Sequence, residues 1–80
     1  MYYVYILKSI EFKNQIYIGF TRDVVKRIDC HNSGGSNHTA KYRPWKLVVS
    51  LTFLSKKRAI EFERYLKTQS GRAFAKKRFF

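Results

Sequence analysis

Two stretches of aromatic and β-branched residues near the start of the chain, separated by a short polar segment, constrain the fold most strongly. Residues 2–8 read YYVYILK, residues 16–20 read IYIGF, and residues 11–15 between them are mostly polar. Such residues favour extended backbone, and two runs joined by a short polar turn predict an antiparallel β-hairpin. Gly19, inside the second run, marks a point where another group comes close to the backbone.

The rest of the chain shows helix, strand and helix signals. Thr21 or Asp23 can cap a helix that ends near Asn32, and residues 33–44 have the composition of a flexible loop. A strand at 45–53, a helix at 56–68 capped by Ser55, a break at Ser70–Gly71 and a short basic helix at 72–80 are predicted to follow. This order, β-β-α-β-α-α, predicts an α+β fold with a small three-stranded antiparallel sheet flanked by helices. With 80 residues there is room for one hydrophobic core, so we expect a single domain over residues 1–80.

The high positive charge of the chain limits the kinds of partner that it can bind. Seventeen Lys and Arg against five Asp and Glu give a net charge of +12. Such an excess is typical of proteins that bind nucleic acid or an anionic membrane. The sequence has no basic amphipathic helix and no long apolar run, so we expect DNA or RNA as the partner and no membrane. A structural basic protein of the ribosomal kind is the alternative on charge alone.

The single cysteine limits the covalent and metal chemistry. Cys30 has no second cysteine with which to form an internal disulfide. No signal peptide precedes the first predicted strand, so the expected location is the cytoplasm. Cys30 and His38 lack the closely spaced ligand pairs of a structural zinc site, and we expect His38 to be a solvated loop residue.

Two basic side chains lie at the edge of the apolar side of the first predicted helix. At about 100° per residue, Val24, Val25 and Ile28 define the apolar direction, and Arg27 and His31 fall beside it, one turn apart. An arginine there can pack its methylenes and keep its charge in water. The stacking of His31 one turn later favours a functional role for the pair.

One acidic residue of the second predicted helix points inward. Ala59, Phe62 and Leu66 define the buried direction, Glu63 projects among them, and Glu61 lies on the opposite side. A buried carboxylate must be paired with a cation or bind a metal ion. Spacing alone leaves open whether Glu63 forms a salt bridge with an arginine or binds a hard divalent cation.

Basic and aromatic residues alternate around the start of the third predicted strand. Lys41, Arg43 and Lys46 flank Tyr42 and Trp45. Phosphate contacts combined with base stacking would explain this pattern, as would a core tryptophan beside a solvated loop. We expect Trp45 to lie in the core and Lys41 and Arg43 to contact DNA. The C-terminal basic residues form a generic phosphate-binding surface: Arg72, Lys76, Lys77 and Arg78.

Taken in order, these residues resemble the GIY-YIG endonuclease superfamily. The triplet Tyr3-Val4-Tyr5 stands for the first family motif, and Tyr17-Ile18-Gly19 matches the second. Arg27 follows ten residues after Tyr17, with His31 one turn later, and Glu63 lies in the penultimate helix. The stretch TAKYRPWKLV at 39–48 continues the resemblance, which covers nearly the whole chain and is similar to the small single-domain bacterial members.

The resemblance implies metal-dependent hydrolysis of phosphodiester bonds, with one divalent cation, Mg²⁺ or Mn²⁺, as cofactor. It implies that Glu63 ligates this ion and that Arg27 holds the phosphate. Tyr17 would be the general base or would orient the attacking water, with Tyr5 as its partner at the scissile phosphate. His31 would support the site or share in proton transfer. A free phenol ionises near pH 10, so a basic role requires positive charge nearby.

The leading hypothesis is therefore a metal-dependent endonuclease that cleaves DNA, on branched or damaged substrates, and acts as a monomer. One alternative is a nucleic-acid-binding module that keeps the fold with little or no catalysis. Another is a nuclease subunit that needs a protein partner for substrate recognition, because 80 residues leave little surface for reading DNA structure.

Overall fold

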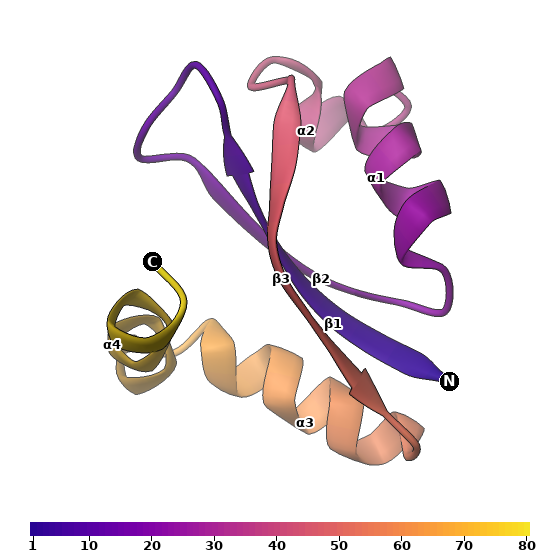
Figure 1. Ribbon diagram of the computed structural model, residues 1–80, viewed down its shortest axis with the longest axis vertical. Helices are drawn as coiled ribbons and strands as arrows, with labels where there is room; N and C mark the ends of the chain where they lie inside the picture. The colour runs from indigo at the N-terminus through magenta and orange to yellow at the C-terminus, as the bar shows by residue number, and fades with distance from the viewer.

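A computed structural model describes residues 1–80 as three strands and four helices (Figure 1). The elements are β1 (Tyr2–Ser9), β2 (Ile16–Thr21), α1 (Val24–Ser33), α2 (Asn37–Ala40), β3 (Trp45–Phe53), α3 (Lys56–Leu66) and α4 (Gln69–Arg78). The strands form one antiparallel sheet in the order β2-β1-β3. The predicted α+β fold with a three-stranded antiparallel sheet is confirmed.

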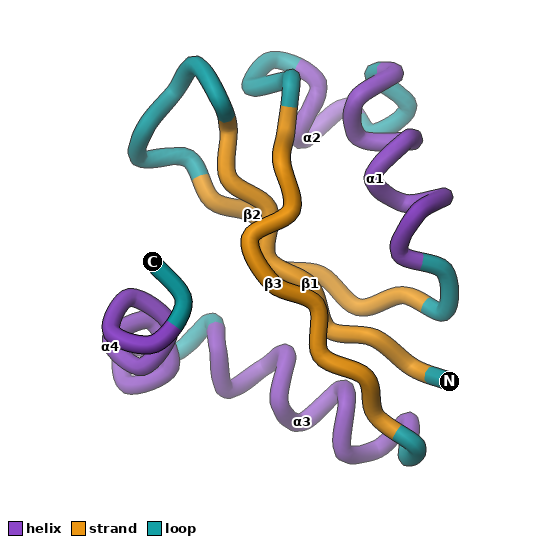
Figure 2. The backbone as a smooth tube through the Cα atoms, in the orientation of Figure 1, coloured by secondary structure: helices purple, strands orange, loops and turns teal.

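The central strand β1 is buried because helices cover both faces of the sheet. Helices α1 and α2 lie on one face, and α3 and α4 lie on the other (Figures 1 and 2). Side chains alternate between the faces along β1, so Val4 and Ile6 pack toward α3 and α4 while Tyr5 and Leu7 pack toward Trp45 on the opposite face. The predicted hairpin is present, and its turn is closed by the Ser9 amide, which donates to the Gln15 carbonyl at 3.0 Å.

Helix α1 begins and ends as its sequence predicts. The Asp23 carboxylate accepts from the Lys26 amide at 3.1 Å, which caps the first turn. Gly34 ends the helix at φ 84°, a left-handed conformation that glycine adopts without strain. One detail was wrong: Val25, predicted on the apolar side, has a side chain that is 71% exposed.

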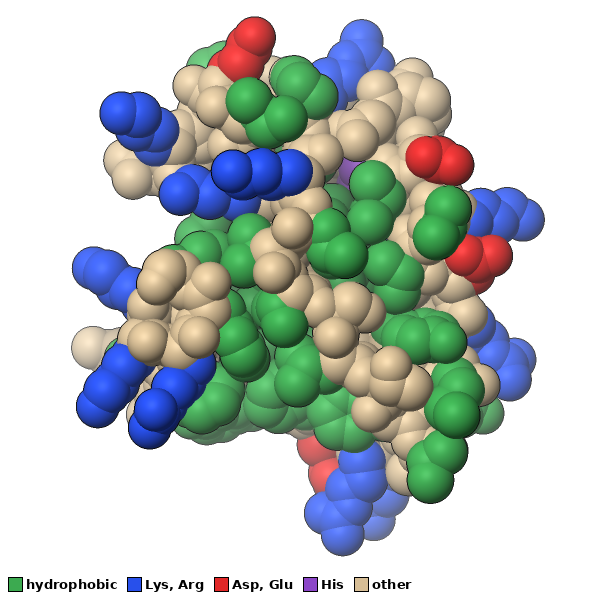
Figure 3. All heavy atoms as spheres, in the orientation of Figure 1, with side chains coloured by type: hydrophobic (Ala, Val, Ile, Leu, Met, Phe, Trp, Pro, Cys, Tyr) green, Lys and Arg blue, Asp and Glu red, His purple; other side chains and the backbone are tan.

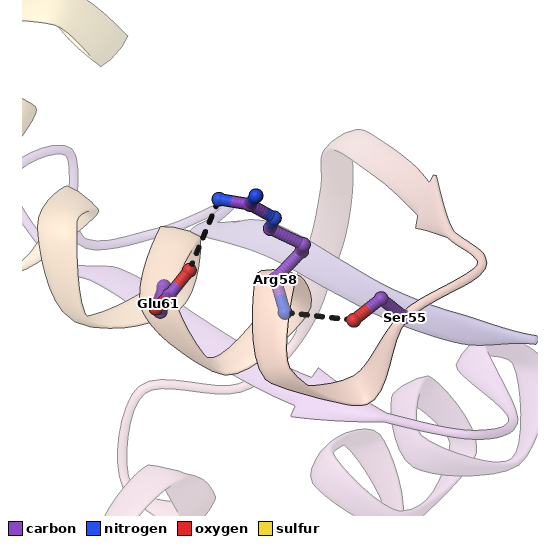
Figure 4. A network of polar contacts seen from close by, with 3 residues as sticks. All are labelled: Ser55, Arg58 and Glu61. Atoms are coloured by element: carbon purple, nitrogen blue, oxygen red, sulfur yellow. Dashed lines mark hydrogen bonds and ion pairs between the residues drawn. The ribbon is translucent and has the colours of Figure 1, made fainter.

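Helices α3 and α4 are joined by a tight connection, and a side chain caps the start of each helix. Figure 4 shows the start of α3, where the Ser55 hydroxyl accepts from the Arg58 amide at 3.3 Å and the Arg58 guanidinium lies 3.6 Å from the Glu61 carboxylate. Helix α3 ends at Leu66, two residues before the predicted end, and Thr68 then caps α4 by accepting from the Gly71 amide at 3.1 Å.

The predicted break at Ser70–Gly71 is therefore wrong, because both residues lie in the first turn of α4. Gly71 is needed there for close packing rather than for a turn. A Cβ atom at this position would overlap the Tyr65 carbonyl at the end of α3.

The second difference lies in the predicted flexible loop over residues 33–44, where residues 37–40 form the short helix α2. This segment is tied to the sheet by side chains. The Asn32 amide oxygen accepts from the Trp45 backbone N–H at 2.6 Å, and its nitrogen donates to the Trp45 carbonyl at 3.1 Å. The Ser9 hydroxyl donates to the Tyr42 carbonyl at 2.6 Å. These contacts fix the far end of α1 and α2 against the sheet.

The main hydrophobic core lies between the sheet and the pair α3 and α4. Val4, Ile6, Ala59 and Leu66 are fully buried there, with Ala75 of α4 at 3% exposure. The longest helix, α3, has 11 residues, and none of the helices is long and apolar enough to cross a membrane.

Candidate active site

Three of the predicted site residues come together on the α1 face of the sheet. The Tyr17 and His31 rings lie 4.6 Å apart between centroids, and the Tyr5 ring lies 6.1 Å from each of them. Tyr5 comes from β1, Tyr17 from β2 and His31 from α1. The hairpin and the helix thus assemble one aromatic cluster from residues far apart in the sequence.

Gly19 makes room for this cluster. It pairs with Tyr5 across the β1–β2 ladder, and a Cβ atom on Gly19 would overlap the Tyr5 phenol. The close approach expected at Gly19 is therefore made by the Tyr5 side chain. Any larger residue would displace the phenol from its place beside His31.

The buried phenol belongs to a chain of hydrogen bonds. The Tyr5 hydroxyl lies 3.1 Å from His31 Nε2, and His31 Nδ1 lies 2.8 Å from Thr39 Oγ1. Thr39 Oγ1 donates to the Ser36 carbonyl at 3.5 Å, so it accepts from Nδ1–H of His31. His31 Nε2 then accepts from the Tyr5 hydroxyl, which assigns the tautomer from its partners. The direction of every hydrogen bond in the chain is thereby set.

Arg27 lies at the open end of this chain. Burial raises the pKa of Tyr5, and the nearby Arg27 guanidinium opposes this shift without cancelling it. The Tyr5 phenol oxygen in turn raises the pKa of Arg27, whose side-chain hydrogen bond is made to Cys30, with Nη1 4.0 Å from Sγ. Burial, followed by the positive charge of Arg27, lowers the pKa of His31. At neutral pH the cluster therefore contains a neutral phenol, a neutral imidazole and a guanidinium cation.

The four residues differ in their access to solvent. The side chain of Tyr5 is 1% exposed and that of His31 is fully buried, whereas Tyr17 and Arg27 are half-buried. Tyr17 lines an open hollow of about 270 Å³ at the free edge of β2, with His38, Lys67 and Arg72 among its other walls. The structure thus leaves Tyr17 and Arg27 accessible, while Tyr5 and His31 support them from inside.

Glu63 lies apart from the aromatic cluster, on α3. Its side chain is 19% exposed, and its Oε2 atom lies 3.1 Å from the ammonium of Lys67, one turn later. Of the two alternatives left open by the spacing, a salt bridge is present, and its partner is the lysine that follows the last residue of α3 rather than an arginine. Because Lys67 also lines the hollow of Tyr17, this ion pair lies at the hollow's α3 side.

Few protein side chains are available to hold a divalent ion. No three His, Cys, Asp or Glu side chains gather into a metal-binding group. Mg²⁺ commonly uses one or two carboxylates and completes its shell with water and substrate phosphate oxygens. The chemistry of Glu63 fits such an ion, because it is a largely buried oxygen donor whose lysine partner lines an open hollow.

The predicted DNA-binding residues fall into two separate groups. Lys41, Arg43 and Lys46 are exposed around the connection between α2 and β3. Lys76 and Lys77 are exposed on α4, on the opposite side of the sheet. Between β3 and α2, Trp45 is 4% exposed and its indole N–H donates to the Thr39 carbonyl at 3.0 Å, so it packs in the core as expected.

Sequence reasoning missed two residues of the site, Thr39 and His38. Thr39 is 1% exposed and orients His31, and the His38 ring lies 6.5 Å from that of Tyr17. Both lie on α2, which the sequence presents as a Gly- and Ser-rich loop. Thr39 is the first residue of the resembling stretch 39–48, and this was the only signal that pointed toward it.

The fold and this cluster together define a nuclease-type domain, and the comparisons with known proteins agree. The sequence model of the GIY-YIG catalytic domain matches residues 1–78, so the chain belongs to the GIY-YIG family. This is a nuclease family whose members generally use a divalent metal ion.

The relatives are of two kinds. A UPF0213 protein of Staphylococcus haemolyticus is 41% identical over 70 residues, which cover 86% of this chain and 83% of that protein. A structure-specific endonuclease subunit SLX1 homolog of Giardia intestinalis is 37% identical over 65 residues, or 76% of this chain. The chain spans only 18% of the length of that Giardia protein.

A solved structure shows the same fold. The solution NMR structure of a UPF0213 protein from Bacillus halodurans superposes with a TM-score of 0.58 at 32% identity, covering 99% of this chain and 87% of that one. The chain is therefore similar over its whole length to small bacterial proteins and over one domain to larger endonuclease subunits.

Proposed function

We propose that this chain is an endonuclease domain that hydrolyses DNA phosphodiester bonds with one divalent ion, Mg²⁺ or Mn²⁺, held by Glu63. The observation that carries the proposal is the arrangement around Arg27. Its guanidinium lies beside a buried phenol that is itself hydrogen-bonded to His31, and a half-buried phenol, Tyr17, belongs to the same cluster. In a chain with a net charge of +12, a cation beside a phenol that solvent can reach suits a phosphodiester.

Each residue has a distinct role in this proposal. Arg27 binds the non-bridging oxygens of the phosphate through its paired N–H groups. Tyr17 accepts a hydrogen bond from the attacking water and orients it. As the water oxygen bonds to phosphorus and the bond to the leaving oxygen breaks, the proton of the water passes to solvent and the leaving oxygen takes up a proton from solvent. Tyr5 and His31 are too buried to touch substrate, so they position Arg27 and Tyr17. When bound, the divalent ion would stabilise negative charge on the phosphate and leaving oxygens.

The substrate and partner are proposed by analogy with the relatives. The SLX1 proteins of Giardia intestinalis and Malassezia globosa are described as structure-specific endonuclease subunits. We extend this to branched or damaged DNA as the substrate of the present chain and to a protein partner that aids recognition. Lys41, Arg43 and Lys46 would contact the DNA backbone on the β3 side of the molecule.

One observation favours a second function, binding of nucleic acid without cleavage. The carboxylate of Glu63 is already engaged by Lys67 at 3.1 Å. If this pair persists when nucleic acid binds, the domain keeps its basic surface and loses its metal ligand.

Strand cleavage tests the two functions against each other. Labelled duplex, flap and four-way-junction DNA would be incubated with wild type, Glu63→Gln and Glu61→Gln, in Mn²⁺ or in EDTA. Glu61 is the matched control, since it is an exposed acid on the same helix that pairs with Arg58. We expect metal-dependent cutting by wild type and Glu61→Gln, reduced at least about a hundredfold in Glu63→Gln. Equal cutting by all three proteins would contradict the role of Glu63, and salt-sensitive binding with no cutting by any of them would favour the binding module.

A further inference from the structure

A second and larger hollow lies between the hairpin turn and α4. Its volume is about 460 Å³, and four basic side chains line it: Lys8, Lys13, Arg72 and Lys76. None of the five acidic residues of the chain lines it. Figure 3 shows Lys and Arg side chains projecting on this side of the molecule, over the hairpin and over α4. We call this hollow the α4 groove.

The floor of the α4 groove is apolar. Ile16 and Phe80 line it with side chains that are 44% and 46% exposed, Ile18 is half-buried, and the buried Ile6 and Ala75 lie beneath them. A ligand that matches this surface has anionic groups for the rim and a flat, weakly polar part for the floor. A nucleotide strand has both, because phosphates can pair with lysines while unstacked bases pack on aliphatic and aromatic side chains.

The α4 groove continues into the hollow of Tyr17. Ile16, Ile18 and Arg72 line both hollows, so the two meet along β2. Strand β2 is an edge of the sheet, so nothing within the chain pairs with its outer side. A strand bound in the α4 groove would therefore pass over β2 toward Tyr17.

The shape of the groove selects an unpaired strand over a duplex. A volume of about 460 Å³ lies in the lower half of the range for small-ligand sites, so it admits a nucleotide or two but no double helix. A duplex also keeps its bases stacked inside, where the apolar floor could not reach them.

We propose that the α4 groove binds an unpaired nucleic-acid strand next to the phosphate that is cleaved. This inference rests on the proposed nuclease function and adds to it the substrate class, nucleic acid with a single-stranded segment beside the scissile bond. Lys8, Lys13 and Lys76 hold the phosphates of that segment, and Arg72 lies where it enters the hollow of Tyr17.

Binding measured in EDTA separates this inference from catalysis. Fluorescence anisotropy would give the affinity of wild type, Lys13→Gln/Lys76→Gln and Lys56→Gln/Lys57→Gln for a labelled oligothymidylate and for a duplex. The second variant is the matched control: it removes the same charge from exposed lysines of α3 that do not line the groove. Circular dichroism would confirm that both variants fold.

We expect the groove variant to bind the single strand about tenfold more weakly than the control variant does, with a smaller change for duplex. The salt dependence of single-strand binding should fall by about 0.7 in logarithmic slope for each lysine removed from contact. Equal single-strand affinity of the two variants would overturn the inference. It would also be overturned if polyglutamate displaced the oligonucleotide as well as unlabelled oligothymidylate does, because the groove would then be a site for acidic protein segments.

The failure of this inference can be told from the failure of the proposed function. If no variant cleaves DNA in Mn²⁺ but the groove variant still loses single-strand affinity, the groove assignment stands and the nuclease assignment fails. If wild type cleaves DNA and the groove variant binds the single strand as tightly as the control variant does, the nuclease assignment stands and the groove assignment fails.

Discussion

The two faces of the sheet are buried in different ways. On the α3 and α4 face, the fully buried side chains are apolar, such as Ile6, Ala59 and Leu66. On the α1 and α2 face, fully or almost fully buried side chains carry polar groups, including Tyr5, His31 and Thr39. All the buried side-chain polar atoms have hydrogen-bond partners. One face is stabilised by area removed from water, and the other holds a polar network beside Arg27 and Tyr17, which we propose it positions.

The largest expected effect comes from the apolar face. Leu66 is fully buried against the sheet, so Leu66→Ala should lower the free energy of unfolding by about 2–5 kcal/mol. Urea denaturation measures this loss. The Tyr5–His31 hydrogen bond should persist under native conditions, because the cavity lies on the face away from Tyr5, so the NMR signals of the His31 ring should keep their positions. A shift of those signals in Leu66→Ala would show that the faces are not separable.

The next largest effect is expected at Gly19, whose backbone closely approaches Tyr5 on the α1 and α2 face of the sheet. Gly19→Ala introduces a methyl group where the Tyr5 phenol lies, which should cost about 1–3 kcal/mol of stability. It should also reduce cleavage beyond that loss, because the displaced phenol no longer lies between His31 and Arg27 in the cluster. Ser50→Ala is the control: Ser50 pairs with Tyr5 from β3 but is exposed. Wild-type cleavage by Gly19→Ala would mean that the position of Tyr5 does not matter.

A smaller effect on stability is expected from a change in pH. Because the pKa of His31 is lowered in the folded state, the unfolded chain binds the proton more readily. The resulting stability is fully present above about pH 6.5, the ordinary value for histidine, and is lost as pH falls below it. Thermal unfolding between about pH 5 and pH 8 measures this dependence.

The exposed His38 provides the control for this pH effect. His38→Gln should keep the fall in stability, and His31→Gln should abolish it. If His31→Gln does not fold, a titration followed by NMR in wild type should show His31 protonating at lower pH than the unfolded chain does. A His31 that titrates at the ordinary value would contradict the buried neutral imidazole.

The smallest effect is expected at the surface of α3. The Arg58–Glu61 pair is 3.6 Å apart, with side chains 77% and 51% exposed, so solvent screens it. Glu61→Gln should change stability by less than about 0.5 kcal/mol and leave cleavage unchanged. A larger change in either would remove this variant as a control for Glu63→Gln.

Most of the fold could be predicted because its strands carry strong local signals. The runs that form β1 and β2 are dense in tyrosine and isoleucine, and β3 was predicted at its observed bounds, Trp45–Phe53. One difference lies at a glycine. Composition predicts a helix break at Gly71, but this residue allows α4 to pack on the end of α3, a tertiary contact that composition does not reveal.

The candidate site could be predicted in part. Helical spacing put Arg27 and His31 together, and the structure joins both to Tyr5. Thr39 escaped notice because its contact with His31 depends on how the segment after α1 folds back, held by Asn32 and Trp45. For Glu63, the helical pattern predicts an inward side chain, which is 19% exposed, but the choice between metal and salt bridge depends on Lys67, whose role as partner was not predicted.

The measurement that tests the central claim most directly is Mn²⁺-dependent cleavage of flap DNA by Arg27→Gln and Arg22→Gln. Both remove one charge near α1, but Arg27 is half-buried beside Tyr5, whereas Arg22 is exposed and lies over the Tyr2 ring. We predict that Arg27→Gln cuts at least about a hundredfold more slowly than wild type, while Arg22→Gln cuts at close to the wild-type rate. Equal rates for the two variants would contradict the claim that the polar face is built to hold Arg27 at a phosphate.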